Sequence, residues 1–258
     1  MFLSADYHTH TVYSHGKGTV LENAESAKIK NLKEIGITDH GFAHFGFGLK
    51  KKDLKTLRSE CESAEKIMGI KVLMGVESNL IGVNGEVDLK PENYDLFDLF
   101  LAGIHKYSLF KGNSLFNLYF PDLFLGKNKK LFISKRLIKN NTRAFVNAVK
   151  NNPIDVITHL NYGCFADPVE VAKVCADYGT YLELNSKKSH LTEDELSGIL
   201  STDVKFVIDS DAHTPDRVGE ISLVENLMEK IEIPKDRIMN IDGKLPDFRF
   251  KHFKEKSL

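Results

Sequence analysis

Short apolar segments alternate with amphipathic stretches along the 258 residues of this chain. The apolar segments are rich in Val, Ile and Leu, which is typical of parallel strands that are buried on both faces. The stretches between them place apolar residues at helical spacing; in 19–35, for example, Leu21, Ala24 and Ala27 share one face. The pattern predicts strands at 2–10, 37–39, 71–76, 99–104, 154–158, 180–184 and 204–208, and helices at 19–35, 53–68, 134–150, 168–178, 192–200 and 215–231.

Capping and turn residues agree with these boundaries. Thr19 and Glu22 have the spacing of a capping box at the start of the first helix. Gly36 and Gly69 are predicted to end the first and second helices. Helix and strand alternate about seven times, which indicates an α/β fold with a parallel sheet, either open or closed. Because α/β barrels often run to roughly 200–250 residues as one unit, we expect one domain over residues 1–258.

Residues 106–135 interrupt the regular alternation. This segment lies between a predicted strand and its helix, and it contains seven aromatic residues and several lysines. Long insertions at such positions are often lids or binding loops. A second interpretation is a small helical excursion whose aromatic side chains pack against the barrel or against the partner in a homo-oligomer. The sequence leaves both interpretations open.

The overall composition excludes several classes of protein. The chain has 35 basic and 36 acidic residues and a formal net charge of −1, so a broad basic field for nucleic acid is not expected. Three cysteines without a C-x-x-C pair predict free thiols and no disulfide framework or cysteine zinc site. No secretory signal and no apolar run of membrane-spanning length is present, which predicts a cytoplasmic protein.

Metal-binding residue types follow almost every predicted strand. In chain order these strand ends carry Asp6-x-His8-x-His10, Asp39-His40, Glu77, His105, His159 and Asp211-x-His213. The carboxyl ends of parallel strands gather on one rim, where ligands and catalytic groups collect. Clustered imidazoles and carboxylates would carry a severe desolvation and repulsion cost there unless cations neutralised them. The pattern therefore predicts a metal site at this rim.

The ligand types and their number restrict the metal. Residues at i and i+2 of a strand point to the same face, so His8 with His10, and Asp211 with His213, can each share an ion. Imidazole combined with carboxylate suits zinc, manganese or iron better than magnesium or calcium. One zinc ion takes three or four protein ligands, and this rim offers more. We therefore expect a cluster of two or three divalent ions.

Seven sequence strings resemble the polymerase-and-histidinol-phosphatase (PHP) family. They are DYHTHTVYSHG, GITDHG, GVESN, GIHK, THLNYG, LELN and DSDAHTPDRVG, and they span residues 6 to 219 in family order. The resemblance implies a distorted (β/α)7 barrel of the TIM type with a trinuclear metal centre at the carboxyl end of the strands. The string GVESNLIGVNGEVD is more similar to the stand-alone phosphatases than to the domains attached to polymerases.

The resemblance also implies individual roles. Glu77 matches the carboxylate that bridges two ions, and His15 matches a ligand position that is usually Asp in the family. Asp6 has no metal in the resemblance and is expected to hold a ligand histidine from behind. The implied ligand set is His8, His10, His15, His40, Glu77, His105, His159, Asp211 and His213. Three histidines fall outside this set: His44 is expected at the surface or behind the ligands, His190 in a loop, and His252 in a solvated basic tail.

The expected reaction is hydrolysis of a phosphomonoester by a hydroxide that bridges two metal ions, with Glu77, Asp211 and His213 as the catalytic residues. Arg217, Lys106 and Lys187 follow strand ends and are candidates for binding the substrate phosphate, although Arg217 could equally pair with a neighbouring acidic residue. The substrate would be histidinol phosphate or another small phosphometabolite.

Two alternatives remain. A PHP-type phosphodiesterase or nuclease is disfavoured by the near-zero net charge, although the local cluster Lys127-Asn128-Lys129-Lys130 leaves it open. A non-catalytic metal-binding module would be expected to lack ligands, and none is missing.

Overall fold

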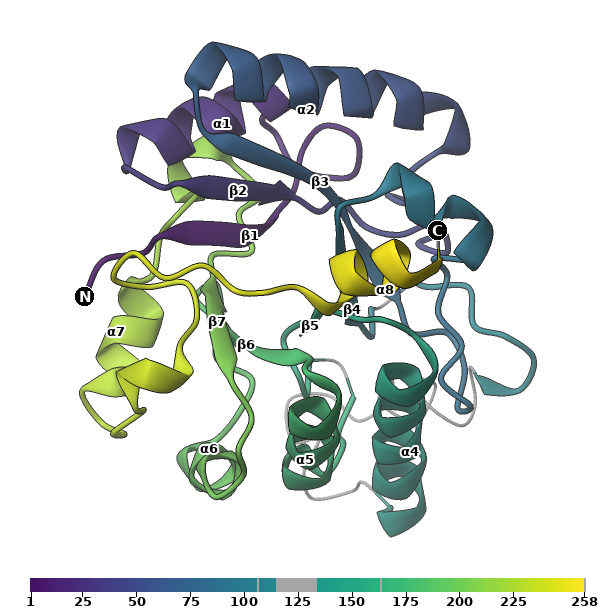
Figure 1. The fold of residues 1–258 in the computed structure, drawn as a ribbon. Helices are drawn as coiled ribbons and strands as arrows, with labels where there is room; N and C mark the ends of the chain where they lie inside the picture. Colours follow the sequence, from purple (N-terminus) through teal and green to yellow (C-terminus); the bar gives the residue numbers. More distant parts are fainter. Residues whose placement is uncertain (106, 115–133, 163, 258) are drawn as a thin grey trace.

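A seven-stranded parallel sheet curls into a nearly closed barrel with helices on its outside (Figure 1). The computed structural model describes residues 1–105, 107–114, 134–162 and 164–257. The strands pair in sequence order and are β1 Ala5–Thr9, β2 Glu34–Ile37, β3 Lys71–Asn79, β4 Leu99–Gly103, β5 Val156–Ile157, β6 Tyr181–Asn185 and β7 Phe206–Asp209. The helices are α1 Val20–Ile29, α2 Leu54–Met68, α4 Lys135–Asn151, α5 Pro168–Tyr178, α6 Glu193–Leu200, α7 Ser222–Met228 and α8 Arg249–Ser257. The predicted (β/α)7 barrel is confirmed.

The barrel closes by a short contact instead of a full ladder. Beyond the end of β7, Ala212 forms a parallel bridge with Thr9 of β1. The backbone N–H of His10 donates to the Ala212 carbonyl at 2.8 Å, and the Ala212 N–H donates to the His8 carbonyl at 3.2 Å. Because these bonds lie at the carboxyl ends of β1 and β7, closure itself places His8 and His10 beside the residues that follow β7.

Local signals explain most boundaries, and two predictions are wrong. Thr19 caps α1 through a capping box with Glu22, as the sequence indicates. The helix nevertheless ends at Ile29 and not at residue 35, because Asn31 adopts a left-handed φ of 58° and turns the chain into β2. Gly36 therefore lies inside β2, where a Cβ would meet the Tyr7 carbonyl oxygen at 2.7 Å. The predicted helix 215–231 is likewise divided by Gly219, whose φ is +70°.

The C-terminal segment closes the amino end of the barrel, and α8 lies across that end (Figure 1). The Phe248 ring meets the Tyr7 ring edge-on at 4.8 Å between centroids, inside the cluster that fills the barrel. The buried Asp155 carboxylate accepts hydrogen bonds from the backbone N–H groups of Phe250 (2.7 Å) and Phe100 (2.9 Å). Aromatic packing and the hydrogen bonds of Asp155 therefore close this end, and the histidine-rich residues lie at the opposite, carboxyl end.

Two further expectations concern the chain as a whole. Cys61, Cys164 and Cys175 are all buried, and none of them is in a disulfide within the part of the chain that the structure describes. No helix among the described residues is long and apolar enough to cross a membrane. Most of the predicted insertion, including Lys106 and residues 115–133, lies outside the described residues, so its proposed roles stay predictions.

Candidate metal centre

All nine predicted ligands converge at the carboxyl end of the barrel. Their ligand atoms form four overlapping groups, and within each group these atoms lie within 4.8 Å of one another. The groups are His10–His15–His40–His213, His8–His159–Asp211, His8–His10–Glu77 and His40–Glu77–His105. Residues distant in sequence meet because each follows a different strand of one parallel barrel.

Glu77 occupies the centre of this arrangement and is fully buried. Its Oε1 atom lies 3.2 Å from Nε2 of His8, 2.9 Å from Nε2 of His105 and 2.8 Å from Nε2 of His159. Its Oε2 atom faces the other way, 2.8 Å from Nδ1 of His40. The two oxygens of one carboxylate thus face different sets of imidazoles, which is the arrangement a bridging ligand requires.

Asp211 holds the second carboxylate of the site. Its Oδ1 atom lies 3.3 Å from Nε2 of His10 and 3.3 Å from Nδ1 of His213. Asp211 has a left-handed φ of 48° and His159 a φ of 27°, a conformation that costs non-glycine residues of order 1–3 kcal/mol each. Backbone strain at two residues of the same cluster indicates that the fold is held to this side-chain geometry.

The contacts among the nine side chains are better explained by divalent metal ions between them than by direct hydrogen bonds. Glu77 Oε2 and His40 Nδ1 are only 2.8 Å apart, yet both are buried and neither makes a well-directed hydrogen bond within the described chain. The Nε2 atoms of His8 and His10 are 3.2 Å apart, as are those of His105 and His159. Two nitrogens bound tetrahedrally to one zinc ion at about 2.0–2.1 Å would lie about 3.3 Å apart. Buried atoms without partners and close nitrogen pairs are both resolved if ions lie between them.

Electrostatics favour the metal-binding forms of most of these groups. Burial raises the pKa of Glu77, but the imidazoles of His105 and His8 outweigh it and hold that pKa well below the usual range. Burial lowers the pKa of His40 to about 3 and that of His15 to about 4. Near neutral pH the carboxylate is therefore an anion and these two imidazoles are neutral, which is the state in which they bind metal.

A second layer of residues orients the ligand rings, and the sequence did not predict its main member. Glu183 of β6 accepts a hydrogen bond from Nδ1 of His8 at 2.5 Å through Oε1, and one from the backbone N–H of His159 at 2.5 Å through Oε2. Asn79 Oδ1 lies 2.9 Å from Nδ1 of His105. The only signal for both was their place inside the family-like strings LELN and GVESN.

The role predicted for Asp6 belongs to Glu183. The Asp6 carboxylate accepts hydrogen bonds from Ser210 N–H at 3.1 Å and Gly219 N–H at 2.7 Å, and it meets His8 only at the backbone N–H, at 3.4 Å. It therefore ties the segment after β7 to β1 and touches no ligand ring. Strand alternation explains the difference, because Asp6 and His8 share a face but Asp6 lies one pleat deeper.

A cavity of about 350 Å³ opens above the ligands. Lys187 lines it, with Nζ 3.3 Å from Asp211 Oδ1 and 3.0 Å from Nδ1 of His213. Arg217 belongs to the short 3-10 helix Pro215–Arg217 and is absent from the described lining, while Lys106 lies outside the described residues. The remaining lining is mainly histidine and aromatic: His15, His40, His44, Phe47, His105, Tyr107, His159, Tyr162, His190 and His213.

The three remaining histidines differ in their surroundings. His44 is buried, and its ring stacks on His40 with 4.9 Å between centroids, so it lies beside a candidate ligand and lines the cavity. His190 is in a loop as predicted, but its ring packs against Tyr162 at 4.7 Å and lines the cavity. His252 is exposed as predicted, although it belongs to α8 and pairs with Asp247.

Comparison with known proteins agrees with this geometry. A probable phosphatase of Caldanaerobacter subterraneus is 28% identical over 256 residues, which cover 92% of this chain and 87% of that protein. A probable phosphatase of a Thermoanaerobacter species is 29% identical over 267 residues, covering 96% and 95%. The histidinol phosphate phosphatase of Lactococcus lactis, solved as a complex with zinc, L-histidinol and phosphate, superposes with a TM-score of 0.58 at 17% identity and covers 89% of this chain and 94% of its own.

The family model for the PHP domain matches residues 6–187. This match covers well over half of the chain and includes seven of the nine residues of the candidate metal centre, all but Asp211 and His213. The structure then places these two residues, which follow β7, against the matched ones. This chain therefore belongs to the PHP domain family.

Proposed function

We propose that this protein is a metal-dependent phosphatase that hydrolyses a small phosphomonoester. The observation that carries the proposal is the nine-residue cluster at the floor of the cavity, with the Lys187 ammonium group beside it. Its relatives of similar length are described as probable phosphatases, and their likeness extends over nearly the whole chain.

Two or three divalent ions, zinc, manganese or iron, would be held by the nine ligands, with Glu77 between two of them. Such ions lower the pKa of a water nucleophile toward 7 and neutralise charge on the phosphate oxygens. The protein side chains have complementary tasks. Glu77 and Asp211 balance the positive charge of the ions, and Lys187 attracts the phosphate. His213 faces the cavity, with Nδ1 2.9 Å from the Asp211 carbonyl oxygen. A water molecule at the ions and the Asp211–His213 pair are our two candidates for protonating the leaving group.

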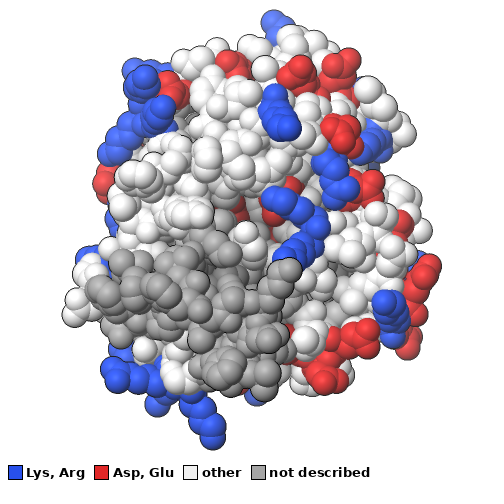
Figure 2. All heavy atoms as spheres, turned by 180° about the vertical axis from the view of Figure 1, so that it is seen from behind, with Lys and Arg blue, Asp and Glu red and all other residues white. Residues whose placement is uncertain are grey.

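The surroundings of the cavity favour a small substrate. Basic and acidic side chains are interspersed over the described part of the face shown in Figure 2, and they form no continuous basic surface of the kind that nucleic acids need. A cavity of about 350 Å³ suits a phosphometabolite. Histidinol phosphate is one candidate, because a structural neighbour binds L-histidinol and phosphate. We also propose that the chain forms one domain and that the protein is cytoplasmic. Residues 106–135 are the segment through which two copies of the chain would associate into a homo-oligomer.

The test is a substrate panel with the purified protein. We expect p-nitrophenyl phosphate and at least one small phosphometabolite to be hydrolysed after loading with zinc or manganese, and activity to disappear on treatment with a chelator and return with metal. Bis(p-nitrophenyl) phosphate and nucleotide 3′ ends should be much poorer substrates. The opposite preference would identify a phosphodiesterase, and turnover that survives complete metal removal would exclude the proposal.

Lys187 should govern substrate binding more than turnover. Replacing it with methionine keeps the aliphatic stem but removes the charge, and a charge-assisted hydrogen bond contributes about 1.5–3 kcal/mol. We therefore expect Lys187→Met to raise KM for p-nitrophenyl phosphate by about 10- to 100-fold, with a smaller change in kcat. Lys173→Met, on the exposed surface of α5, is the matched control. Equal kinetics for the two variants would remove Lys187 from the site.

A further inference from the structure

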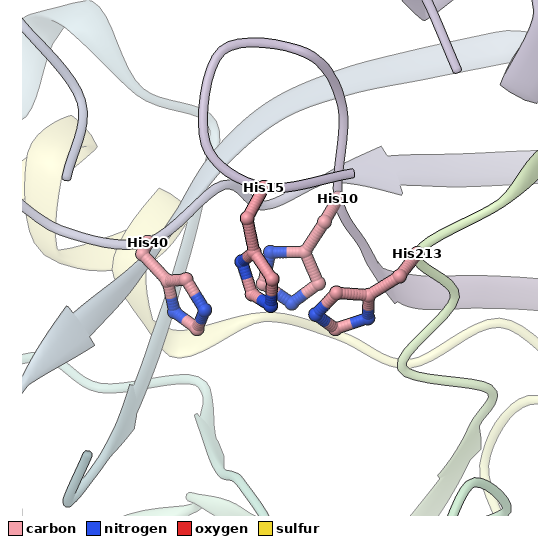
Figure 3. A group of neighbouring side chains, drawn as sticks. All are labelled: His10, His15, His40 and His213. Atoms are coloured by element: carbon pink, nitrogen blue, oxygen red, sulfur yellow. The ribbon is translucent and has the colours of Figure 1, made fainter. Parts of the chain in front are cut away.

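One of the four ligand groups contains only imidazoles. His10 and His15 come from the segment around the end of β1, His40 follows β2, and His213 follows β7, and the four rings point toward one another (Figure 3). The ring centroids are 4.1 Å apart for His15 and His213, 4.3 Å for His10 and His213, and 4.8 Å for His15 and His40. One ion can therefore reach nitrogen atoms from three separate segments of the barrel rim.

The other three groups each include a carboxylate. Glu77 belongs to two of them and Asp211 to the third, whereas neither belongs to the four-histidine group. Carboxylate oxygens do approach three of its members. Glu77 Oε2 lies 2.8 Å from Nδ1 of His40, and Asp211 Oδ1 lies 3.3 Å from both Nε2 of His10 and Nδ1 of His213. Lys187 Nζ lies 3.3 Å from the same Asp211 oxygen and offsets its charge. Among the described residues, the candidate centre thus combines three groups that contain a carboxylate with one group whose members are all imidazoles.

His15 is the member that completes the nitrogen-only group. Its side chain is only partly buried; the ring stacks nearly parallel to His40 at an interplanar angle of 7° and lies 5.0 Å from the Phe47 ring. No hydrogen bond to its ring nitrogens occurs within the described chain, although it lies among polar groups. An imidazole held by ring packing, with free nitrogens facing three other imidazoles, is placed as a ligand would be.

Donor chemistry then separates the sites. Neutral imidazole suits zinc, copper, nickel and iron, while carboxylate oxygen suits manganese and magnesium; affinity for nitrogen sites also rises from manganese toward zinc. A carboxylate adds negative charge that a weakly bound ion such as Mn²⁺ needs, and four neutral imidazoles add none. Manganese is therefore disfavoured in the four-histidine group far more than in the groups that contain Glu77.

We propose that the His10–His15–His40–His213 group is a zinc-selective site within a centre whose Glu77-containing sites also accept manganese. The proposal rests on the metal centre of the proposed function, but it concerns ion selectivity and not catalysis. In an environment that offers both ions, the centre would hold different metals at adjacent positions. The identity of residue 15 sets this selectivity, because it is the position where an oxygen ligand would change the donor set.

The experiment measures metal binding directly. The metal-free full-length protein is saturated with Mn²⁺, separated from free ion, and analysed for bound metal; Zn²⁺ is then titrated in, and Mn²⁺ release is followed by electron paramagnetic resonance. We expect the Mn²⁺-saturated protein to take up one further equivalent of Zn²⁺ without releasing Mn²⁺. Replacement of Zn²⁺ by Co²⁺ should give the intense visible absorption of a four-coordinate nitrogen site.

His15→Asp is the decisive variant, because it replaces one nitrogen donor by an oxygen. We expect it to bind one more equivalent of Mn²⁺ than the original protein and to lower the preference of this site for Zn²⁺ over Mn²⁺ at least 10-fold. His15→Ala should weaken the additional zinc equivalent at least 10-fold without adding manganese, and His252→Asp on exposed α8 should change nothing. Circular dichroism and thermal unfolding establish that each variant is folded.

Two results would overturn the proposal: equal numbers of Mn²⁺ and Zn²⁺ in the original protein, or an unchanged zinc preference in a folded His15→Asp protein. Both are independent of the phosphatase assay. A protein without phosphatase activity can still show the selective site, and an active phosphatase can still bind manganese at every position, so failure of this inference and failure of the proposed function are distinguishable.

Discussion

Replacing Glu77 with glutamine is expected to reduce phosphatase activity by at least about 10³-fold while the barrel stays folded. Charge stabilisation by metal ions contributes several kcal/mol to the transition state, and each 1.36 kcal/mol corresponds to a tenfold change in rate. Glu77 is the residue on which this stabilisation depends most. Its two oxygens lie within 3.2 Å of four imidazoles, those of His8, His40, His105 and His159.

Glutamine has nearly the shape of glutamate, so the change isolates charge and donor type. The amide nitrogen cannot bind a metal ion, and the single remaining oxygen cannot face both sets of imidazoles. We expect elemental analysis to find at least one equivalent of metal fewer in the purified variant than in the original protein. We expect kcat to fall in parallel. Glu25→Gln, on the exposed side of α1, is the matched control. Full metal content and unchanged turnover in the Glu77 variant would remove the bridging role.

The convergence of the nine candidate ligands could be predicted from the sequence because two simple regularities place them. Parallel strands in a barrel bring their carboxyl ends to one rim, and residues two apart share a face of a strand. His8 with His10, and Asp211 with His213, follow from these rules and from the family resemblance. The left-handed backbone at Asp211 does not change this result. The end of β7 already brings the following residues to the rim before the chain turns at Asp211.

Residues behind the ligands could not be predicted in the same way. Glu183 reaches His8 across 175 positions of sequence, and that contact depends on the barrel order β1–β7–β6 and on its closure at Ala212. A buried glutamate inside the string LELN looks like any polar residue within a strand. Asp6, two residues from His8, was the more obvious candidate, but sequence proximity along a strand does not bring its carboxylate to the ring of His8.

The same limit explains the two helix boundaries. Apolar spacing continues from Leu21 to Ile35, so the pattern predicts one helix, yet Ile35 is buried because it belongs to a strand. The apolar pattern does not show where the helix α1 ends and the strand β2 begins. The left-handed conformation of Asn31 makes that distinction. The helix ends there through local backbone hydrogen bonds, from Asn31 N–H to the Lys28 carbonyl and from Leu32 N–H to the Ala27 carbonyl.

Glu183→Gln is expected to weaken metal binding about 10- to 100-fold, the usual effect of removing a partner that orients a metal ligand. Glu183 uses one oxygen for Nδ1 of His8 and the other for the backbone N–H of His159, and it also accepts a hydrogen bond from Asn185 Nδ2 at 3.0 Å. Glutamine can accept with one oxygen only, so either the His8 ring or the strained His159 backbone loses its support. Glu193→Gln, exposed at the start of α6, is the matched control.

The decisive comparison is activity against metal concentration. If Glu183 acts by orienting His8, the variant should recover most of its kcat when zinc is raised about 100-fold, because the ligands themselves are intact. A residue that supported only the fold would instead lower the midpoint of thermal unfolding and leave the zinc dependence of activity unchanged. A residue that acted on the substrate would raise KM at every zinc concentration. Because Glu183 contacts ligand residues and no part of the described cavity lining other than His159, recovery by zinc is the expected outcome.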